Sequence, residues 1–462
     1  MTQTLAAAMG QGSVARLLFR FSVPAILGLV ANALYNIVDR LFIGRFAGAD
    51  SLGAVGLTFP ISVFVIAVGS LVGVGSASQL SRRLGEGRRK EAGKILGTAM
   101  TVMTLTAALL TAGGLLCLDT LVSMMGASAR LAPLTRIYTE IVFWGLPFNL
   151  LGFALNYLIR AEGYPRYAMW TLVIGAGANV FLDWLFIVHM HMGVAGAALG
   201  TSLAQIAAFI WVALFYLRGR SSLQVSAASL RPDWDILKET LLVGASPFLM
   251  ELFYTFSMML FNNLVNRLGG DSAIAAMGLF FCLDSLIYLP VFGIGEGLQP
   301  IVGYSYGAGQ YGRLKKAVLL AVAASTAYFM LSFLGAEIFT RSMVLLFNSD
   351  DAALIDLTVR AMRIGYIGMP LAAAGIVASN ALVAIGKAGM SLFLNLCRQG
   401  LLFVPALLLL PRIFGLDGVW GSFAVVDAGG GLVGALLLWL QWDCFGGESG
   451  NEAEGRLGMA LK

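Results

Sequence analysis

The sequence predicts an all-α polytopic membrane protein with twelve transmembrane helices in two six-helix bundles. Three observations predict this fold: the composition is 58% hydrophobic and only 12% charged, twelve long segments are apolar, and the two halves of the chain resemble one another. A soluble domain carries about 25% charged residues, so half that share indicates a chain surrounded by lipid. The 56 glycines are small enough to let transmembrane helices approach one another closely.

Each predicted span is a mostly apolar run at least as long as the roughly 20 residues that cross a bilayer. The runs are continuous rather than alternating, which disfavours a membrane β-barrel. In chain order the predicted spans are 17–43, 52–80, 93–118, 134–159, 165–189, 193–217, 238–266, 273–303, 315–340, 358–385, 389–411 and 417–441.

Basic residues predict the orientation of these spans. If both termini are cytoplasmic, 20 of the 30 Lys and Arg residues fall on the cytoplasmic side. We therefore expect a multi-pass protein of the cell membrane with both termini inside. The N-terminus lacks a basic region followed by an apolar stretch, so we expect no cleaved signal.

The two halves share motifs about 222 residues apart. Because six is even, both halves enter the membrane in the same sense, and a pseudo-two-fold axis along the membrane normal relates them. The repeat predicts an N-terminal lobe at 1–220, a cytoplasmic linker at 221–237, a C-terminal lobe at 238–442 and a flexible tail at 443–462. The corresponding pieces include Pro24 and Pro247, GADS 48–51 and GGDS 269–272, GLP 145–147 and GMP 368–370, and GVAG 193–196 and GLDG 415–418.

Two aspartates, Asp39 and Asp183, lie in apolar spans of the first half. An ionised carboxylate at bilayer depth costs about 2.5–3.5 kcal/mol, so each must be paired, protonated or bound to a cation. Asn179 lies one helical turn before Asp183 on the same face, and Thr201 is expected at a similar depth. Carboxylate, amide and hydroxyl oxygens suit Na⁺, and two neighbouring carboxylates equally suit a proton.

A structural alternative is that these polar groups only join helices, with Asp39 paired to the neighbouring Arg40 or Arg45. The repeat argues against a purely structural pair. The corresponding positions in the second half fall near Asn262 and Pro405, and neither is acidic, so the packing shared by the two halves does not require the acids.

The second half carries its own acids within spans, Glu251, Asp284 and Glu296. A carboxylate that faces an apolar cavity can bind a cationic substrate, and we assign these three to substrate binding. Arg398 and Asp427 also fall within spans, where we expect them to pair in a structural role.

Several functions are excluded by what the sequence lacks. It contains no GxxxxGK[ST], HExxH or GxSxG motif, so we expect neither an ATP-driven pump nor an enzyme, and no cofactor other than a coupling ion. The four cysteines form no CxxC pair. The basic segment 82–94 is typical of a loop at anionic lipid, not of a nucleic-acid site.

Five segments together resemble the multidrug and toxic compound extrusion (MATE) family, and most of all its MepA-like bacterial branch. They cover much of the chain in the family's order: YNIVDRLFIGRFAGADSLGAVGLTFP at 35–60, IRAEGYPR at 159–166, GANVFLDWLFI at 177–187, GVAGAALGTSLAQ at 193–205 and GEGLQPIVGYSYGAG at 295–309. The resemblance implies a cation-coupled drug antiporter that works as a monomer.

Site residues follow from the same resemblance, position by position. It implies cation coupling at Asp39, Asn156, Asn179, Asp183 and Thr201. The helix-8 acid of the MepA-like branch corresponds to Glu296, and Glu251 matches an acid of the related NorM branch. The related NorM branch also has an aspartate in its tenth helix, whereas residues 369–379 here contain none.

These expectations amount to H⁺- or Na⁺-coupled export of lipophilic, often cationic compounds by alternating access. The alternative from the same superfamily is an exporter or flippase of lipid-linked sugars or other amphiphiles. A membrane enzyme or a receptor is a third possibility that no catalytic motif supports.

Overall fold

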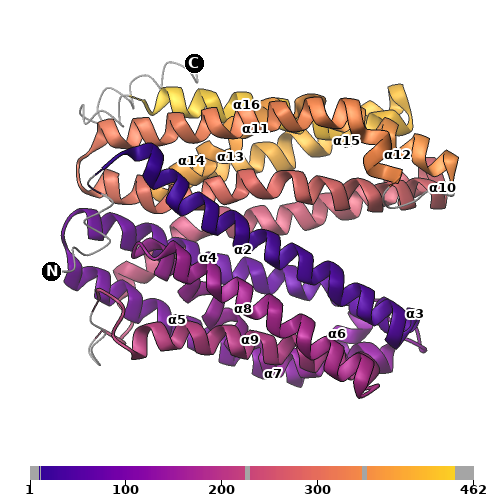
Figure 1. The fold of residues 1–462 in the computed structure, drawn as a ribbon, viewed down its shortest axis with the longest axis horizontal. Helices are drawn as coiled ribbons and strands as arrows, with labels where there is room; N and C mark the ends of the chain where they lie inside the picture. The colour runs from indigo at the N-terminus through magenta and orange to yellow at the C-terminus, as the bar shows by residue number, and fades with distance from the viewer. Residues whose placement is uncertain (1–9, 11, 224–228, 346–350, 443–462) are drawn as a thin grey trace. The chain divides into compact units, whose positions relative to one another are not determined.

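The computed structural model describes residues 10, 12–223, 229–345 and 351–442, and these residues are helical almost throughout (Figure 1). Twelve helical segments are long and apolar enough to cross a membrane, which confirms the predicted number. The fifth and sixth, Pro165–His189 and Gly193–Leu217, match the predicted bounds, whereas most others extend a few residues further. The predicted tail at 443–462 lies outside the described residues.

The all-α, two-unit fold class is confirmed. The elements of the first half, in order, are α2 (Val14–Phe42), η1 (Ile43–Ala47), α3 (Ala49–Leu57), α4 (Phe59–Gly85), α5 (Arg89–Leu116), α6 (Leu118–Met124), α7 (Ala132–Ala161), α8 (Pro165–Asp183), η2 (Trp184–His189) and α9 (Gly193–Leu217). Those that follow are α10 (Trp234–Gly307), α11 (Tyr311–Leu345), α12 (Ala352–Gly365), η3 (Tyr366–Gly368), α13 (Met369–Ala384), α14 (Ala388–Leu396), η4 (Cys397–Leu402), α15 (Phe403–Phe414) and α16 (Leu416–Leu440).

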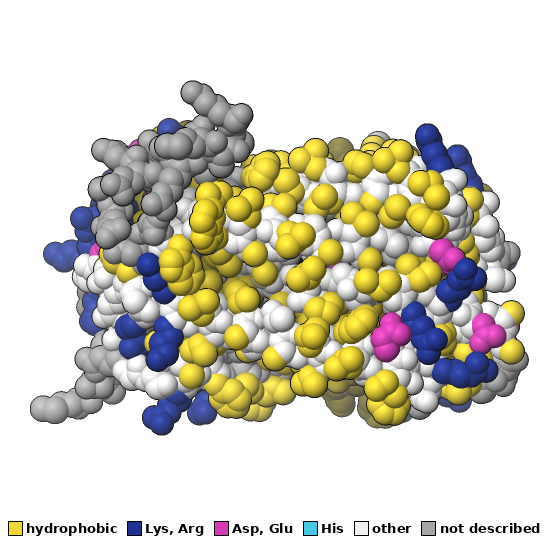
Figure 2. Space-filling view, turned by 90° about the horizontal axis from the view of Figure 1, so that it is seen from above, with side chains coloured by type: hydrophobic (Ala, Val, Ile, Leu, Met, Phe, Trp, Pro, Cys, Tyr) yellow, Lys and Arg dark blue, Asp and Glu magenta, His cyan; other side chains and the backbone are white. Residues whose placement is uncertain are grey.

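The helices present apolar side chains outward as well as inward, as a lipid environment requires. Leu109, Leu116 and Ile413 are among the large hydrophobic side chains that are more than two-thirds exposed. Figure 2 shows hydrophobic side chains over most of the visible face, with Lys and Arg gathered toward the ends of the helices.

The backbone repeats as the sequence does. Glycines with positive φ, a conformation that side chains with a Cβ rarely adopt, end or separate helices at matching positions in the two halves. The matching pairs, 222 or 223 residues apart, are Gly48 with Gly270, Gly87 with Gly309, Gly163 with Gly386, and Gly193 with Gly415. Gly270 also interrupts α10, which therefore contains two spans, Trp234–Gly270 and Ser272–Gly307.

The chain divides into two compact units. Unit 1 contains Pro24–Phe248, and unit 2 contains the first helix up to Val23 together with Leu249–Lys462. The described residues of the predicted linker and those up to Phe248 thus belong to unit 1.

Close packing explains why the linker belongs to unit 1. The Thr101 hydroxyl donates to the Leu230 carbonyl at 2.7 Å, and the Gln79 amide donates to the Ile236 carbonyl and the Thr240 hydroxyl, both at 3.0 Å. Gly97 lies so close to the Ser229 carbonyl that a Cβ would overlap it. Residues 229–240 therefore pack against α4 and α5.

Three segments are π-helical, with wider turns than an α-helix: η1, η2 and η4. Such turns are frequent at functional sites because they change which side chains face a given side. η2 begins directly after Asp183, and η4 contains Arg398.

Candidate functional site

Asp39 and Asp183 face each other from two helices of unit 1. Asp39 lies in the last turn of α2, directly before η1, and Asp183 is the last residue of α8, directly before η2. Their carboxyl groups are within hydrogen-bonding reach of each other, which brings together the two acids that the sequence singled out.

Three of the four carboxyl oxygens of this pair lack a hydrogen-bond donor among the described residues. Both oxygens of Asp183 and Oδ1 of Asp39 are buried without a partner, and Asp183 is 0% exposed. Two ionised carboxylates can only accept, whereas a proton on one lets it donate to the other. A bound proton or a small cation would therefore satisfy this pair.

The charge of Arg40 acts on Asp39, but the ion pair of the structural alternative does not form. Among the described side chains, Asp39 forms no ion pair, and the Arg45 guanidinium lies instead over the Phe46 ring. Two buried carboxylates without an ion-pair partner are unfavourable, which favours reversible neutralisation of the pair.

Other polar groups surround the pair. Asn179 is 1% exposed, and neither its amide nitrogen nor its amide oxygen has a hydrogen-bond partner. Tyr138 lies within hydrogen-bonding reach of Thr201 and within electrostatic range of both acids. Tyr35 is within electrostatic range of both acids as well. The unpaired oxygens of Asp39, Asp183 and Asn179 could hold Na⁺ as well as a proton.

Gly200 on α9 makes room for the acid pair. A Cβ at this position would overlap Oδ1 of Asp183. Because Gly200 has no side chain, the Asp183 carboxylate can lie directly against α9. Any larger residue at position 200 would displace it.

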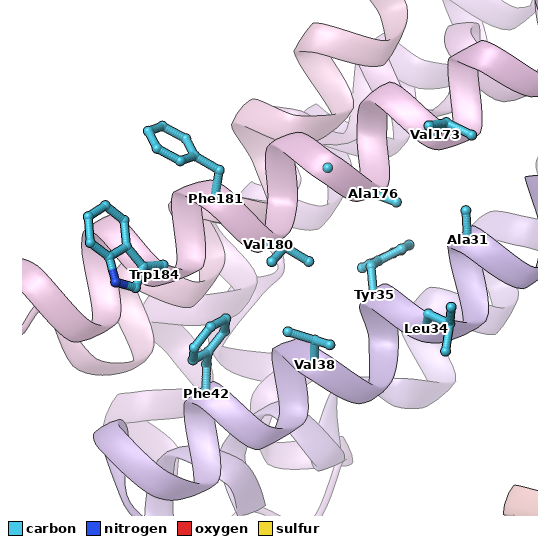
Figure 3. A pocket seen from close by; sticks show the side chains of 11 residues that line it. Ala31, Leu34, Tyr35, Val38, Phe42, Val173, Ala176, Val180, Phe181 and Trp184 are labelled. Carbon is cyan, nitrogen blue, oxygen red and sulfur yellow. The ribbon is translucent and has the colours of Figure 1, made fainter.

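An apolar groove of about 700 Å³ runs beside the pair between α2 and α8 (Figure 3). Its walls carry no charged side chain, and Tyr35 belongs to both the groove and the surroundings of the acids. The lining residues are Ala31, Leu34, Tyr35, Val38, Phe42, Val173, Ala176, Gly177, Val180, Phe181 and Trp184. An aromatic or aliphatic ligand would fit such a wall.

Asn156, assigned to the same site by the resemblance, lies elsewhere. Its amide nitrogen donates to the Ala168 carbonyl at 2.7 Å, and its oxygen accepts from Arg160 at 3.1 Å. Ala168 and Asp183 are separated by about 22 Å along α8 at 1.5 Å per residue. In this structure Asn156 joins α7 to the start of α8.

The acids of the second half form no single group with one another. Glu251 and Asp284 both lie within electrostatic range of Tyr254. Glu296 lies about 18 Å further along α10 than Asp284, at 1.5 Å per residue. Glycines on either side of it pack against Asn380 and Ser22.

Arg398 and Asp427 pair, as expected. Nη2 of Arg398 is 3.7 Å from Oδ1 of Asp427, and the Tyr288 hydroxyl donates a short hydrogen bond to Oδ2 of Asp427. Sequence reasoning did not include Tyr288 in this pair.

Outside the spans, Glu162 in the loop between α7 and α8 is buried at 0% exposure. Its Oε2 accepts from the Ser221 hydroxyl at 2.7 Å and from the Ser222 amide at 3.2 Å. Burial raises the pKa of Glu162 to about 7, although these hydrogen bonds oppose the shift. The carboxyl therefore titrates near neutrality while it holds the start of the linker.

Sequence reasoning missed Tyr35, Tyr138 and Gly200. Tyr35 is four residues before Asp39 and so faces the same side of its helix, a signal that the spacing carried. The position of Tyr138 depends on how α7 packs, which no local pattern reveals. Within the described residues, no group of three or more His, Cys, Asp or Glu side chains could hold a metal ion.

Comparisons with known proteins agree with this architecture. The MatE family model matches residues 24–185 and again residues 247–408. The multidrug export protein MepA of Staphylococcus aureus (strain N315) is 26% identical over 440 residues, which covers 93% of this chain and 94% of that protein. MepA of Staphylococcus saprophyticus is 26% identical over 444 residues, covering 94% and 95%.

Solved structures extend the likeness to the whole fold. An outward-facing multidrug resistance MATE family transporter of the MOP superfamily matches with a TM-score of 0.90 and 25% identity, covering 96% of this chain and 99% of its own. A MOP superfamily transporter from Pyrococcus furiosus, for which reversed polarity of the binding pocket suggests a different function, also matches with a TM-score of 0.90, 25% identity and the same coverage.

Proposed function

The chain belongs to the MatE family, and we propose that it is a cation-coupled antiporter that exports lipophilic, often cationic compounds. The bias of Lys and Arg supports a place in the bacterial cell membrane with both termini in the cytoplasm. We propose that one chain suffices for transport, because each unit already holds buried polar groups of its own. The multidrug export activity of the MepA relatives supports the class of substrate.

One observation carries the proposal: among the described residues the Asp39–Asp183 pair forms no ion pair and three of its four carboxyl oxygens have no hydrogen-bond partner, and it adjoins an apolar groove through Tyr35. A structural ion pair would have its counter-charge. A pair without one is neutralised by what it binds, and its charge changes when that ion leaves. The groove supplies an apolar wall for a substrate next to this changing charge.

Coupling follows from competition. With the acids ionised, the pair attracts a lipophilic cation to the neighbouring groove. With a proton or Na⁺ bound, the attraction is lost and the substrate leaves. A ligand shifts a conformational equilibrium only through different affinities for the two states, so ion and substrate must oppose each other in the same site. Glu251, Asp284 and Glu296 remain proposed substrate contacts in the second half.

The proposal is tested in proteoliposomes that hold the purified protein and a fluorescent lipophilic cation such as ethidium. A pH gradient and a Na⁺ gradient are imposed separately, and efflux is followed in each. We expect efflux from one gradient and a loss of at least tenfold in both Asp39→Asn and Asp183→Asn. Full gradient-driven efflux by Asp183→Asn at equal protein content would rule out the role of the pair.

The same experiment identifies the ion. If Na⁺ is the coupling ion, the oxygens of Asp39, Asp183 and Asn179 would hold it, and Na⁺ would supply the neutralising charge without any proton. In that case we expect Asn179→Ala to weaken Na⁺-driven efflux.

Export of an amphiphile such as a lipid-linked sugar is the second candidate. The absence of charged side chains in the groove lining described here favours it, because such a wall would accept a lipid tail. Transport of a fluorescent lipid-linked sugar in the same liposomes, with no response to ethidium, would support this alternative.

A further inference from the structure

A second group of buried ionisable side chains lies entirely within unit 2. It consists of Asp284 and Tyr288 on α10, Tyr366 in η3, Arg398 in η4 and Asp427 on α16, and we call it the C-terminal carboxyl cluster. Tyr366 and Asp427 are buried and Asp284 is half-buried. Packing of distant segments, not a local motif, brings the five together.

The two carboxyl groups in this cluster have unequal surroundings. Asp427 accepts a hydrogen bond from the Tyr288 hydroxyl and has Arg398 at 3.7 Å. Asp284 lies one helical turn before Tyr288 on the same face of α10, next to the tyrosine that bonds Asp427. Within the part of the chain that the structure describes, Asp284 has neither a hydrogen-bond donor nor a cation, and the charge that acts on it is that of Asp427. Asp427 therefore has partners that favour its anionic form, and Asp284 has none among them.

The cluster also contains a donor without an acceptor. Tyr366 is 1% exposed, its hydroxyl has no hydrogen-bond partner, and it is within electrostatic range of both Asp284 and Asp427. Nε of Arg398 is likewise buried and unpaired. Buried polar groups are almost always satisfied, so unpaired ones at one place point to something that binds there.

We propose that Asp284 is an exchangeable proton-binding site, separate from the Asp39–Asp183 pair, and that Asp427 stays ionised beside it. The carboxylate takes a proton from a hydronium ion and leaves water, and it returns the proton to water on release. Protonated Asp284 can donate a hydrogen bond, which no ionised carboxylate can do. Arg398 stabilises the neighbouring anion and so directs the proton to Asp284.

The surroundings favour a proton over a metal cation. Arg398 places a positive charge next to Asp427, which repels Na⁺ from the oxygens that would coordinate it. The other ionisable groups that face the cluster are Tyr254, from the preceding part of α10, and Glu251, which also acts on Tyr254. Neither adds a positive charge that would neutralise Asp284.

Glycine at position 430 fixes the arginine in place. A Cβ at Gly430 would lie 2.5 Å from Cγ of Arg398 and 2.8 Å from its Cδ. The side chain of Arg398 therefore passes directly over the α16 backbone, three residues beyond Asp427. This close approach keeps the guanidinium on the Asp427 side of the cluster.

The test measures proton binding rather than transport, so it does not depend on the proposed antiport. Full-length protein carrying Asp39→Asn and Asp183→Asn is purified in a weakly buffered, Na⁺-free solution. Proton uptake after acidification and the infrared band of protonated carboxyl groups are recorded. In this background we expect Asp284→Asn to lose the band of one carboxyl group and about one proton of uptake per molecule.

Two matched variants separate proton binding from a structural role. Asp427→Asn should retain the uptake, and Asp284→Glu should restore it, with all proteins compared by thermal unfolding to confirm that they fold. Uptake that is unchanged in Asp284→Asn, or lost in Asp427→Asn but not in Asp284→Asn, would overturn the assignment. So would loss of the infrared band when Na⁺ is added at constant pH, because that result would show a metal-cation site.

Discussion

The carboxylate of Asp183 occupies the space that a side chain at Gly200 would fill. This contact packs α8 against α9 where the acid pair forms. Glycine is needed at position 200 for this lack of space and not for its backbone conformation, which is that of an ordinary helix.

Gly200→Ala should therefore impair ion coupling while both acids remain. The added methyl group displaces the Asp183 carboxylate from Asp39, and we expect gradient-driven efflux to fall at least tenfold. Overpacking of this kind also costs about 1–3 kcal/mol of stability. Gly113→Ala is the matched control, because no atom lies within 4 Å of a Cβ there. Equal efflux by the two variants would contradict the positioning role.

Asn179→Leu should stabilise the protein and inactivate it. The amide is buried with neither atom paired, and an unsatisfied buried polar group costs about 1–3 kcal/mol, which the apolar side chain of similar size removes. We expect a higher Tm in detergent together with loss of coupled efflux.

Asn395→Leu provides the contrast for this substitution. Asn395 is also buried, but its oxygen accepts from the Ser379 hydroxyl at 3.2 Å. We expect Asn395→Leu to lower the Tm. If Asn179→Leu lowers it as well, the Asn179 amide has a structural partner and the functional interpretation is wrong.

Glu162 should make stability depend on pH. Its pKa in the folded protein, about 7, lies above its ordinary value of 4.5, so the folded state binds more protons than the unfolded state between these values. The free energy of unfolding therefore decreases as pH rises from about 4.5 to 7, by up to about 3 kcal/mol at 1.36 kcal/mol per pKa unit.

Glu162→Gln tests this contribution. The variant should remove the decrease, whereas Ser221→Ala should steepen it because the ionised carboxylate loses a donor. Thermal unfolding of the three proteins across this pH range provides the measurement. A wild-type profile in Glu162→Gln would show that other groups cause the dependence.

Gly97→Val should release the linker from α5. Its side chain would overlap the Ser229 carbonyl, and the neighbouring hydrogen bond from Thr101 to Leu230 should break with it. We expect trypsin to cleave after Arg231 several times faster than in the wild type. Gly113→Val serves as control, and equal cleavage in both variants would show that the linker is not held by this contact.

Much of the fold could be predicted because its signals are local. Apolar length predicted the spans, and the offset between short motifs predicted a repeat that the positive-φ glycines display again. Asp39 and Asp183 were recognisable because a carboxylate is conspicuous in an apolar segment.

What could not be predicted depends on contacts between distant segments. Nothing in the sequence shows that the Tyr366 hydroxyl lies unpaired within electrostatic range of Asp284. The close contact between Gly97 and the Ser229 carbonyl likewise depends on how the helices pack. The position of Asn156 also illustrates this limit: the resemblance assigned it to coupling, whereas its hydrogen bonds join it to Arg160 and Ala168.

The prolines at the start of each repeat coincide with the places where the described chain passes from one unit to the other. Unit membership changes between Val23 and Pro24 and again directly after Phe248, next to Pro247. Each proline lacks the amide hydrogen that would bond four residues back, so its helix can bend there without losing a hydrogen bond. The first turns of each half thus belong to the unit formed by the rest of the other half. A chain cut at the middle of the sequence would therefore separate these turns from the residues with which they pack.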